Sequence, residues 1–191
     1  MPKNRLEAFS DGVIAILITI MVLELEVPHE PTVAALAPLW PVLACYVMSF
    51  VYLGIYWNNH HHLLHAARHV NGATLWANAH LLFWLSLVPF VTAWMGENHF
   101  ASIPVAAYGG VLLMCAIAYT ILVRVLLKLE GRDSFLAHAI GSDRKGNASL
   151  LLYALGIVVA CKLPLVACAL YVTVAIIWLV PDRRIEKRLE H

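Results

Sequence analysis

Long apolar segments alternate with short polar ones along the whole chain. A helix needs about 20 apolar residues to cross the hydrocarbon core of a bilayer, which is about 30 Å thick. One apolar stretch near the C-terminus is interrupted at CKLPL, where Lys162 and Pro164 predict a tight hairpin. The pattern therefore predicts an all-α polytopic membrane protein in which residues 1–191 form one domain of six transmembrane helices. The expected spans are about 4–27, 39–59, 73–95, 104–128, 148–161 and 164–180.

Composition and charge place these segments in a lipid bilayer and predict their orientation. Hydrophobic residues make up 61% of the chain and charged residues only 13%, far from the average of soluble proteins. If all six segments cross the bilayer, every one of the 13 lysines and arginines except Lys162 falls on one side. Because cytoplasmic loops are enriched in lysine and arginine, both termini are expected in the cytoplasm.

Motifs for catalysis are missing from the sequence. It contains no nucleotide-binding loop, no G-x-S-x-G turn and no H-E-x-x-H pair. We therefore expect neither an enzyme nor a nucleic-acid partner. The cysteines show no C-x-x-C spacing and are expected to be small core residues rather than zinc ligands or disulfides. They are Cys45, Cys115, Cys161 and Cys168.

The first segment, RLEAFSDGVIAILITIMVLELEVP, is short and charged at both ends. Its apolar part runs only from Gly12 to Leu23, which is about 18 Å of helix at 1.5 Å per residue. That length is well below the thickness of the hydrocarbon core, so lipid cannot be its main neighbour. Charged residues at membrane depth usually face the interior of a bundle or a water-filled path. The pattern is typical of a central helix.

Helical geometry divides the first segment into two sides. At 100° per residue, Ser10 and Asp11 lie about 120° and 140° from Ile16, so they are expected to bond to neighbouring helices. The other side is either ordinary interhelical packing or a hydrophobic constriction in an ion path. Glu24 and Glu26, at the end where cations would enter, favour the second interpretation. This apolar side consists of Ile16, Thr19, Ile20, Leu23 and Val27.

Three motifs in the first half of the chain resemble those of a known family. The first is R-x-x-x-F-S-D-G from Arg5 to Gly12, the second is YWNNHH from Tyr56 to His61, and the third joins Asn78 to LSLVPF. Together they resemble the prokaryotic relatives of the endolysosomal transmembrane potassium channel. The resemblance covers the first three segments by motif and the last three only by hydropathy.

The resemblance implies a homotetramer in the bacterial inner membrane, with the first helix of each subunit lining a central pore. It implies a potassium-permeable leak channel with no cofactor and without a TVGYG filter, which is absent here. Ile16, Ile20 and Leu23 then form the constriction, and Thr19 is tied to cation selectivity. The resemblance also implies a network that holds the pore helix against the second and third helices. Its members are Arg5, Phe9, Ser10, Asp11, Trp57, His60 and Asn78.

Two alternatives stay open at this point. His61, His65 and His69 repeat every four residues, which suits either a divalent metal or a solvated helix end that senses pH. A proton-coupled secondary transporter or a proton-conducting channel is the alternative to a potassium channel. A broken helix or a carboxylate at the bilayer midplane would favour a transporter, and the sequence indicates neither.

Overall fold

The computed structural model describes residues 3–131, 134, 136–137 and 144–179, and every regular element in these ranges is helical. The predicted all-α membrane class is therefore confirmed. The elements are α1 (Lys3–Leu23), the 3₁₀ helix η1 (Val33–Leu39), α2 (Trp40–Ala66), α3 (Gly72–Ser86), α4 (Val88–Glu97), α5 (Ser102–Glu130), α7 (Arg144–Ala160) and α8 (Pro164–Leu179).

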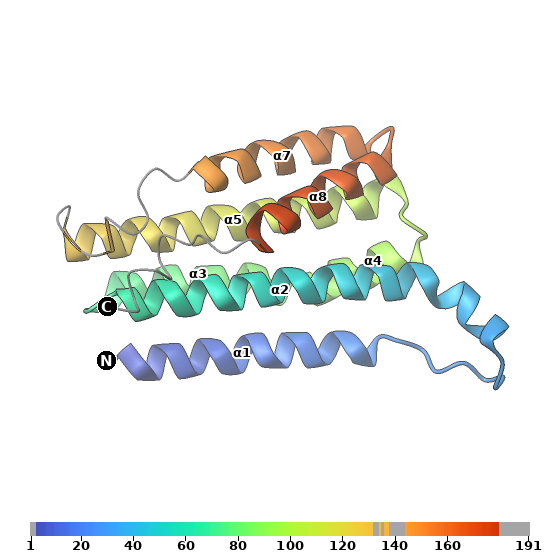
Figure 1. The fold of residues 1–191 in the computed structure, drawn as a ribbon, viewed down its shortest axis with the longest axis horizontal. Helices are drawn as coiled ribbons and strands as arrows, with labels where there is room; N and C mark the ends of the chain where they lie inside the picture. The colour runs from blue at the N-terminus through green and yellow to red at the C-terminus, as the bar shows by residue number, and fades with distance from the viewer. Residues whose placement is uncertain (1–2, 132–133, 135, 138–143, 180–191) are drawn as a thin grey trace.

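The helices run up and down along one common direction (Figure 1). α1 lies at one edge of the bundle beside α2, and α7 lies at the opposite edge. The start of α1 and the ends of α2 and α5 share one end of the molecule, whereas η1 and the turn between α7 and α8 lie at the other end. Lys3, at the start of α1, and Lys162, in the turn after α7, therefore lie at opposite ends of the molecule.

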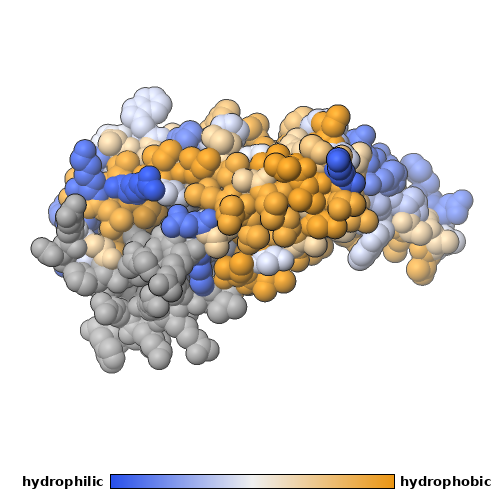
Figure 2. All heavy atoms as spheres, turned by 90° about the horizontal axis from the view of Figure 1, so that it is seen from above, coloured by the Kyte–Doolittle hydropathy of each residue, from blue (hydrophilic) through white to orange (hydrophobic). Residues whose placement is uncertain are grey.

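Four helical stretches are long and apolar enough to cross a membrane, namely Lys3–Leu23, Val33–Ala66, Gly72–Glu97 and Ser102–Glu130. α7 and α8 are shorter apolar helices of 17 and 16 residues. They form a hairpin in which the amide of Leu163 donates to the carbonyl of Val159 at 2.8 Å. Figure 2 shows an apolar band across the middle of one face and hydrophilic side chains at its two ends.

Several element boundaries differ from those expected. α1 ends at Leu23 rather than near residue 27, so Val27 lies beyond the helix. Pro28 disfavours helical geometry at the preceding residue. The carboxylates of Glu24 and Glu26 would be repelled by the negative C-terminal end of the helix dipole, so they disfavour a longer helix. α2 continues to Ala66, seven residues past the expected end at 59, because no glycine or proline interrupts this stretch.

The third predicted segment is divided at Leu87. Pro89 has no amide hydrogen to donate to the carbonyl four residues earlier, so the regular ladder stops and α4 begins with proline in its first turn. The expectation that no span is broken is therefore wrong here, although only Leu87 separates the two helices. A second correction concerns Cys161, which is exposed at the turn after α7, whereas Cys45 and Cys115 are buried as expected.

The core between α2, α5, α7 and α8 is packed around tyrosines. Tyr52, Tyr108 and Tyr171 are almost completely buried. The ring of Tyr171 lies against Gly109 and Gly156, and a Cβ atom at either glycine would overlap it. A hydroxyl cluster joins α2, α4 and α5, because Ser49 bonds to Thr92 at 2.6 Å and to Tyr108 at 2.9 Å. This core lies on the side of α2 away from α1, which packs against α2, α3 and α4.

Candidate pore helix and its attachment

One side of α1 is buried against the bundle and the other is open in the single chain. The buried side consists of Leu6, Ser10, Ile14, Leu17 and Met21. On the open side, Ile16 is 57% exposed, Ile20 40% and Leu23 79%. Thr19 is exposed between them, and its hydroxyl donates to the carbonyls of Ala15 at 3.2 Å and Ile16 at 2.9 Å. The structure thus groups these four residues in one exposed row, which we call the open row.

A buried hydrogen-bond chain attaches α1 to α3 and α2. The side-chain amide of Asn78 donates to the hydroxyl of Ser10 at 2.9 Å, and Ser10 donates to the carbonyl of Leu6. His60 Nε2 and Asn78 Oδ1 lie 2.7 Å apart. Since an amide oxygen only accepts, the imidazole carries its hydrogen on Nε2, and Nδ1 has no partner among the described residues. All three side chains are buried, so the chain fixes the rotation of α1 about its axis.

A second line of polar contacts follows the seam between α1 and α2. The indole of Trp57 donates to Asp11 Oδ1 at 3.0 Å. One turn nearer the N-terminus, Glu7 Oε1 lies 3.1 Å from His61 Nδ1. One further turn on, the ammonium of Lys3 donates to the carbonyl of Ala67, where a cation suits the end of α2. We call Lys3, Glu7, Asp11, Trp57 and His61 the polar seam.

Sequence reasoning missed Lys3 and Glu7 as attachment residues. Their signal was present, because Lys3, Glu7 and Asp11 are spaced four apart and so share one side of α1. On α2, the rings of Trp57 and His61 stack with centroids 6.2 Å apart. Two helices with polar side chains every fourth residue can form such a ladder, but either sequence alone does not show that they are neighbours.

Arg5 and Phe9 do not join the network in which the resemblance places them. Phe9 is 59% exposed, and no hydrogen bond or ion pair joins Arg5 to a described residue. Helical geometry explains this, since Arg5 and Phe9 lie within about 20° of Ile16 on the helix wheel. They therefore extend the open row toward the N-terminus. Glu24 and Glu26 are exposed just beyond the other end of α1.

After Trp57, His61 and His65 lie in one row on α2. Their rings stack with centroids 6.0 Å apart. Within the described ranges, no three His, Cys, Asp or Glu side chains are grouped so that they could hold a metal ion. His69 lies beyond the end of α2, where Glu130 Oε1 accepts from the backbone amides of Arg68 and His69. This carboxylate fixes the turn after α2 to the end of α5.

Comparisons with known proteins identify chains that are similar in sequence and in fold. A family model described as "Endosomal/lysosomal potassium channel TMEM175" matches residues 5–89. A potassium channel of Chryseobacterium sp. (strain P1-3) is 56% identical over 190 residues, which cover 100% of this chain and 99% of that protein. The crystal structure of a lysosomal potassium-selective channel TMEM175 homolog from Chamaesiphon minutus superposes with a TM-score of 0.80 at 29% identity. That superposition covers 93% of this chain and 96% of the other.

A more distant relative is named as a proton channel. The endosomal/lysosomal proton channel TMEM175 of Danio rerio is 38% identical over 86 residues, which cover 39% of this chain and 16% of that protein. The shared part is therefore a small share of the vertebrate protein.

Proposed function

This chain belongs to the TMEM175 family of potassium channels, and we propose that four copies assemble in the bacterial inner membrane as a potassium-permeable leak channel whose central path is lined by α1. The observation that carries the proposal is the open row of Ile16, Thr19, Ile20 and Leu23 on a helix whose opposite side is buried. The apolar part of this helix is too short to face lipid alone. A closed cyclic assembly would bury four such rows against one another.

In such an assembly the open row would form successive rings along the path. Ile16 and Ile20 are about 6 Å apart along the axis, and Ile20 and Leu23 about 4.5 Å, at 1.5 Å per residue. Narrow apolar rings oppose the entry of water and hydrated ions, so they act as a gate by dewetting. Thr19 would place a hydroxyl oxygen between two rings, where a partly dehydrated cation can be coordinated.

Charged groups at the ends of the path would set its preference for cations. Glu24 and Glu26 are exposed beyond α1, so a tetramer would gather eight carboxylates at the outer mouth and raise the local cation concentration. With the lysine and arginine distribution, both termini would lie in the cytoplasm. We keep the bracing role for Ser10, Asp11, Trp57, His60 and Asn78, and expect Arg5 and Phe9 to face the path or a neighbouring copy.

The test is reconstitution in a planar bilayer under opposed potassium and sodium gradients, with wild type, Ile16→Asn and Val22→Asn compared. Val22 is also exposed on α1 but lies about 120° from Ile16, so it serves as the matched control. We expect unitary currents in wild type, several-fold larger conductance or open probability in Ile16→Asn because a polar ring stays hydrated, and little change in Val22→Asn.

Three results would contradict the proposal. Saturable ion exchange with a fixed stoichiometry, and without unitary currents, would identify a proton-coupled transporter. A reversal potential that follows the proton gradient and does not change with the potassium gradient would identify a proton channel. The vertebrate relative is named as such a channel. Equal effects of Ile16→Asn and Val22→Asn would show that the open row does not line the path.

A further inference from the structure

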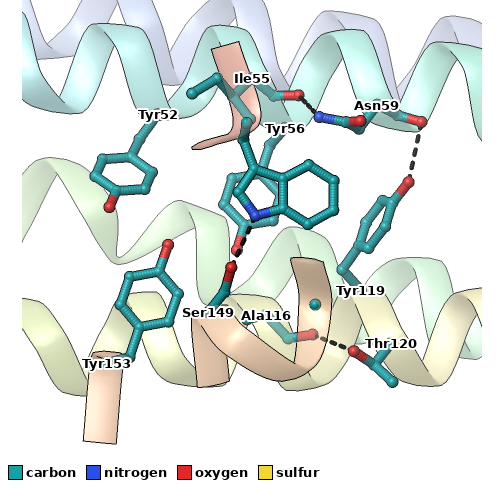
Figure 3. A pocket seen from close by; sticks show the side chains of 11 residues that line it. Tyr52, Ile55, Tyr56, Asn59, Ala116, Tyr119, Thr120, Ser149 and Tyr153 are labelled. Carbon is teal, nitrogen blue, oxygen red and sulfur yellow. Dashed lines mark hydrogen bonds between the residues drawn. The ribbon is translucent and has the colours of Figure 1, made fainter. Parts of the chain in front are cut away.

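A pocket lies between α2, α5, α7 and the last turn of α8 (Figure 3). It belongs to a different part of the subunit from the open row of α1. Part of the pocket is open to the outside. Five aromatic rings line it, together with Ala116 of α5. The rings belong to Tyr52, Tyr56, Tyr119, Tyr153 and Trp178.

No Asp, Glu, Lys, Arg or His is among the described residues that line the pocket. A charged ligand would therefore enter an apolar site without a compensating charge, which costs several kcal/mol even when the site is partly hydrated. Aromatic walls instead favour an uncharged molecule with an aromatic or aliphatic body, because rings pack edge to face or offset against such a body. The described part of the lining is therefore better suited to an uncharged ligand than to an ion.

Most polar groups around the pocket are already bonded within the protein. The indole of Trp178 donates to Ser149 at 2.8 Å, and Thr120 donates to the carbonyl of Ala116 at 2.8 Å. Tyr119 donates to the backbone carbonyl of Asn59. These bonds fix the walls and leave the same groups less available to a ligand. They also make the cavity a preformed site, which lowers the entropic cost of binding.

The hydroxyl of Tyr56 is different. Tyr56 is only 9% exposed, it lines the pocket, and its hydroxyl makes no hydrogen bond to any described residue. Most polar groups of largely buried residues have a partner within the protein, so this hydroxyl is available to a molecule in the pocket. A hydrogen-bonding group of a ligand placed beside Tyr56 would form a hydrogen bond with this hydroxyl.

We propose that this pocket binds a small neutral amphiphile of the phenol type, with its ring between the aromatic walls and its hydroxyl bonded to Tyr56. Such molecules partition into membranes and so reach a site within the bundle. The next residue, Trp57, bonds to Asp11 on α1, so the pocket and the attachment of the pore helix share one turn of α2.

The experiment uses the full chain in detergent and 4-bromophenol as the probe. Bromine quenches tryptophan fluorescence at short range, and Trp178 lies in the pocket wall. We expect saturable quenching whose saturable part is lost in Trp178→Phe. Ala116→Phe should abolish it by filling the pocket, whereas Ala154→Phe, an equal enlargement at an exposed site on α7, should leave it intact.

Tyr56→Phe tests the hydrogen bond separately from the shape of the cavity. We expect it to weaken 4-bromophenol binding roughly three- to tenfold, which is the worth of one neutral hydrogen bond, while binding of bromobenzene stays unchanged. This comparison also decides the matter if Ala116→Phe does not fold. Quenching that rises linearly with probe and is equal in all variants, or saturable quenching that survives both Trp178→Phe and Tyr56→Phe, would overturn the proposal.

Discussion

α2 meets α1 on one side and α5, α7 and α8 on the other, and the two contacts are built differently. Toward α1 the contact is a line of polar pairs, such as Trp57 with Asp11 and His61 with Glu7. Toward the other side it consists of large buried rings such as Tyr52, and Tyr171 fills the space that two glycines leave. The first contact is directional and partly exposed, and the second is closely packed.

The difference separates two physical tasks. Close packing of rings against glycine supplies stability in proportion to area and tolerates little change of volume. A few directional hydrogen bonds supply less stability but fix the rotation of α1, and so decide which of its side chains form the open row. A helix whose open row is to line a path needs directional hydrogen bonds of this kind to fix its rotation.

The largest effect is expected where a methyl group is added beside Tyr171. Gly109→Ala would place its Cβ in the space of the Tyr171 hydroxyl, so we expect the free energy of unfolding to fall by about 3 kcal/mol. Gly110→Ala is the matched control, because nothing lies within 4 Å of its added Cβ. Thermal unfolding in detergent measures both. Equal stability of the two variants would show that Tyr171 of α8 is not closely packed against α5.

A smaller loss is expected on the α1 side. Ser10→Ala removes the acceptor of the Asn78 amide and leaves a buried donor unpaired, so it should lower the free energy of unfolding by about 2 kcal/mol. Ser86→Ala on α3 is the control, since that hydroxyl is exposed and bonded only to the carbonyl of Phe83. It should change stability by less than about 0.5 kcal/mol. If both variants behave alike, the buried chain does not hold α1.

The smallest change in stability is expected in the polar seam itself. Asp11→Ala removes one partly exposed hydrogen bond from Trp57, worth about 1 kcal/mol. Because Asp11 faces away from the open row, we expect a lower yield of tetramer and an unchanged ratio of potassium to sodium permeability. Size-exclusion chromatography and bilayer recordings measure the two quantities. A normal tetramer yield with altered ion preference would place Asp11 in the path instead.

The sequence predicted much of the fold because hydrophobic length and period are local properties. Six apolar segments, the hairpin at Lys162 and the separation of Ser10 and Asp11 from Ile16 all follow from counting residues along a helix. Boundaries were less well predicted. The helix break at Leu87 was missed because Pro89 was interpreted within one continuous apolar run, and α2 continued past Asn59 into a polar stretch.

The attachment residues were harder to predict because they depend on neighbours far along the chain. Asn78 lies 68 residues from Ser10 and 18 from His60, and only the packing of α1, α2 and α3 brings them together. The motif that contains Arg5 and Phe9 suggested a common role with Ser10 and Asp11, but the four side chains project to different sides of α1. Sequence proximity within a motif does not imply contact on a helix.

The sequence by itself therefore determined that this is a membrane protein, how many apolar segments it has and which side chains share a face, since each depends on composition and on a 3.6-residue period. Only the tertiary structure decided which face of α1 is buried, that Lys3 and Glu7 attach it to α2, and that Tyr56 opens into a pocket. Those features depend on which surfaces meet, and hydrogen bonds and close packing select those surfaces over distances that no local pattern encodes.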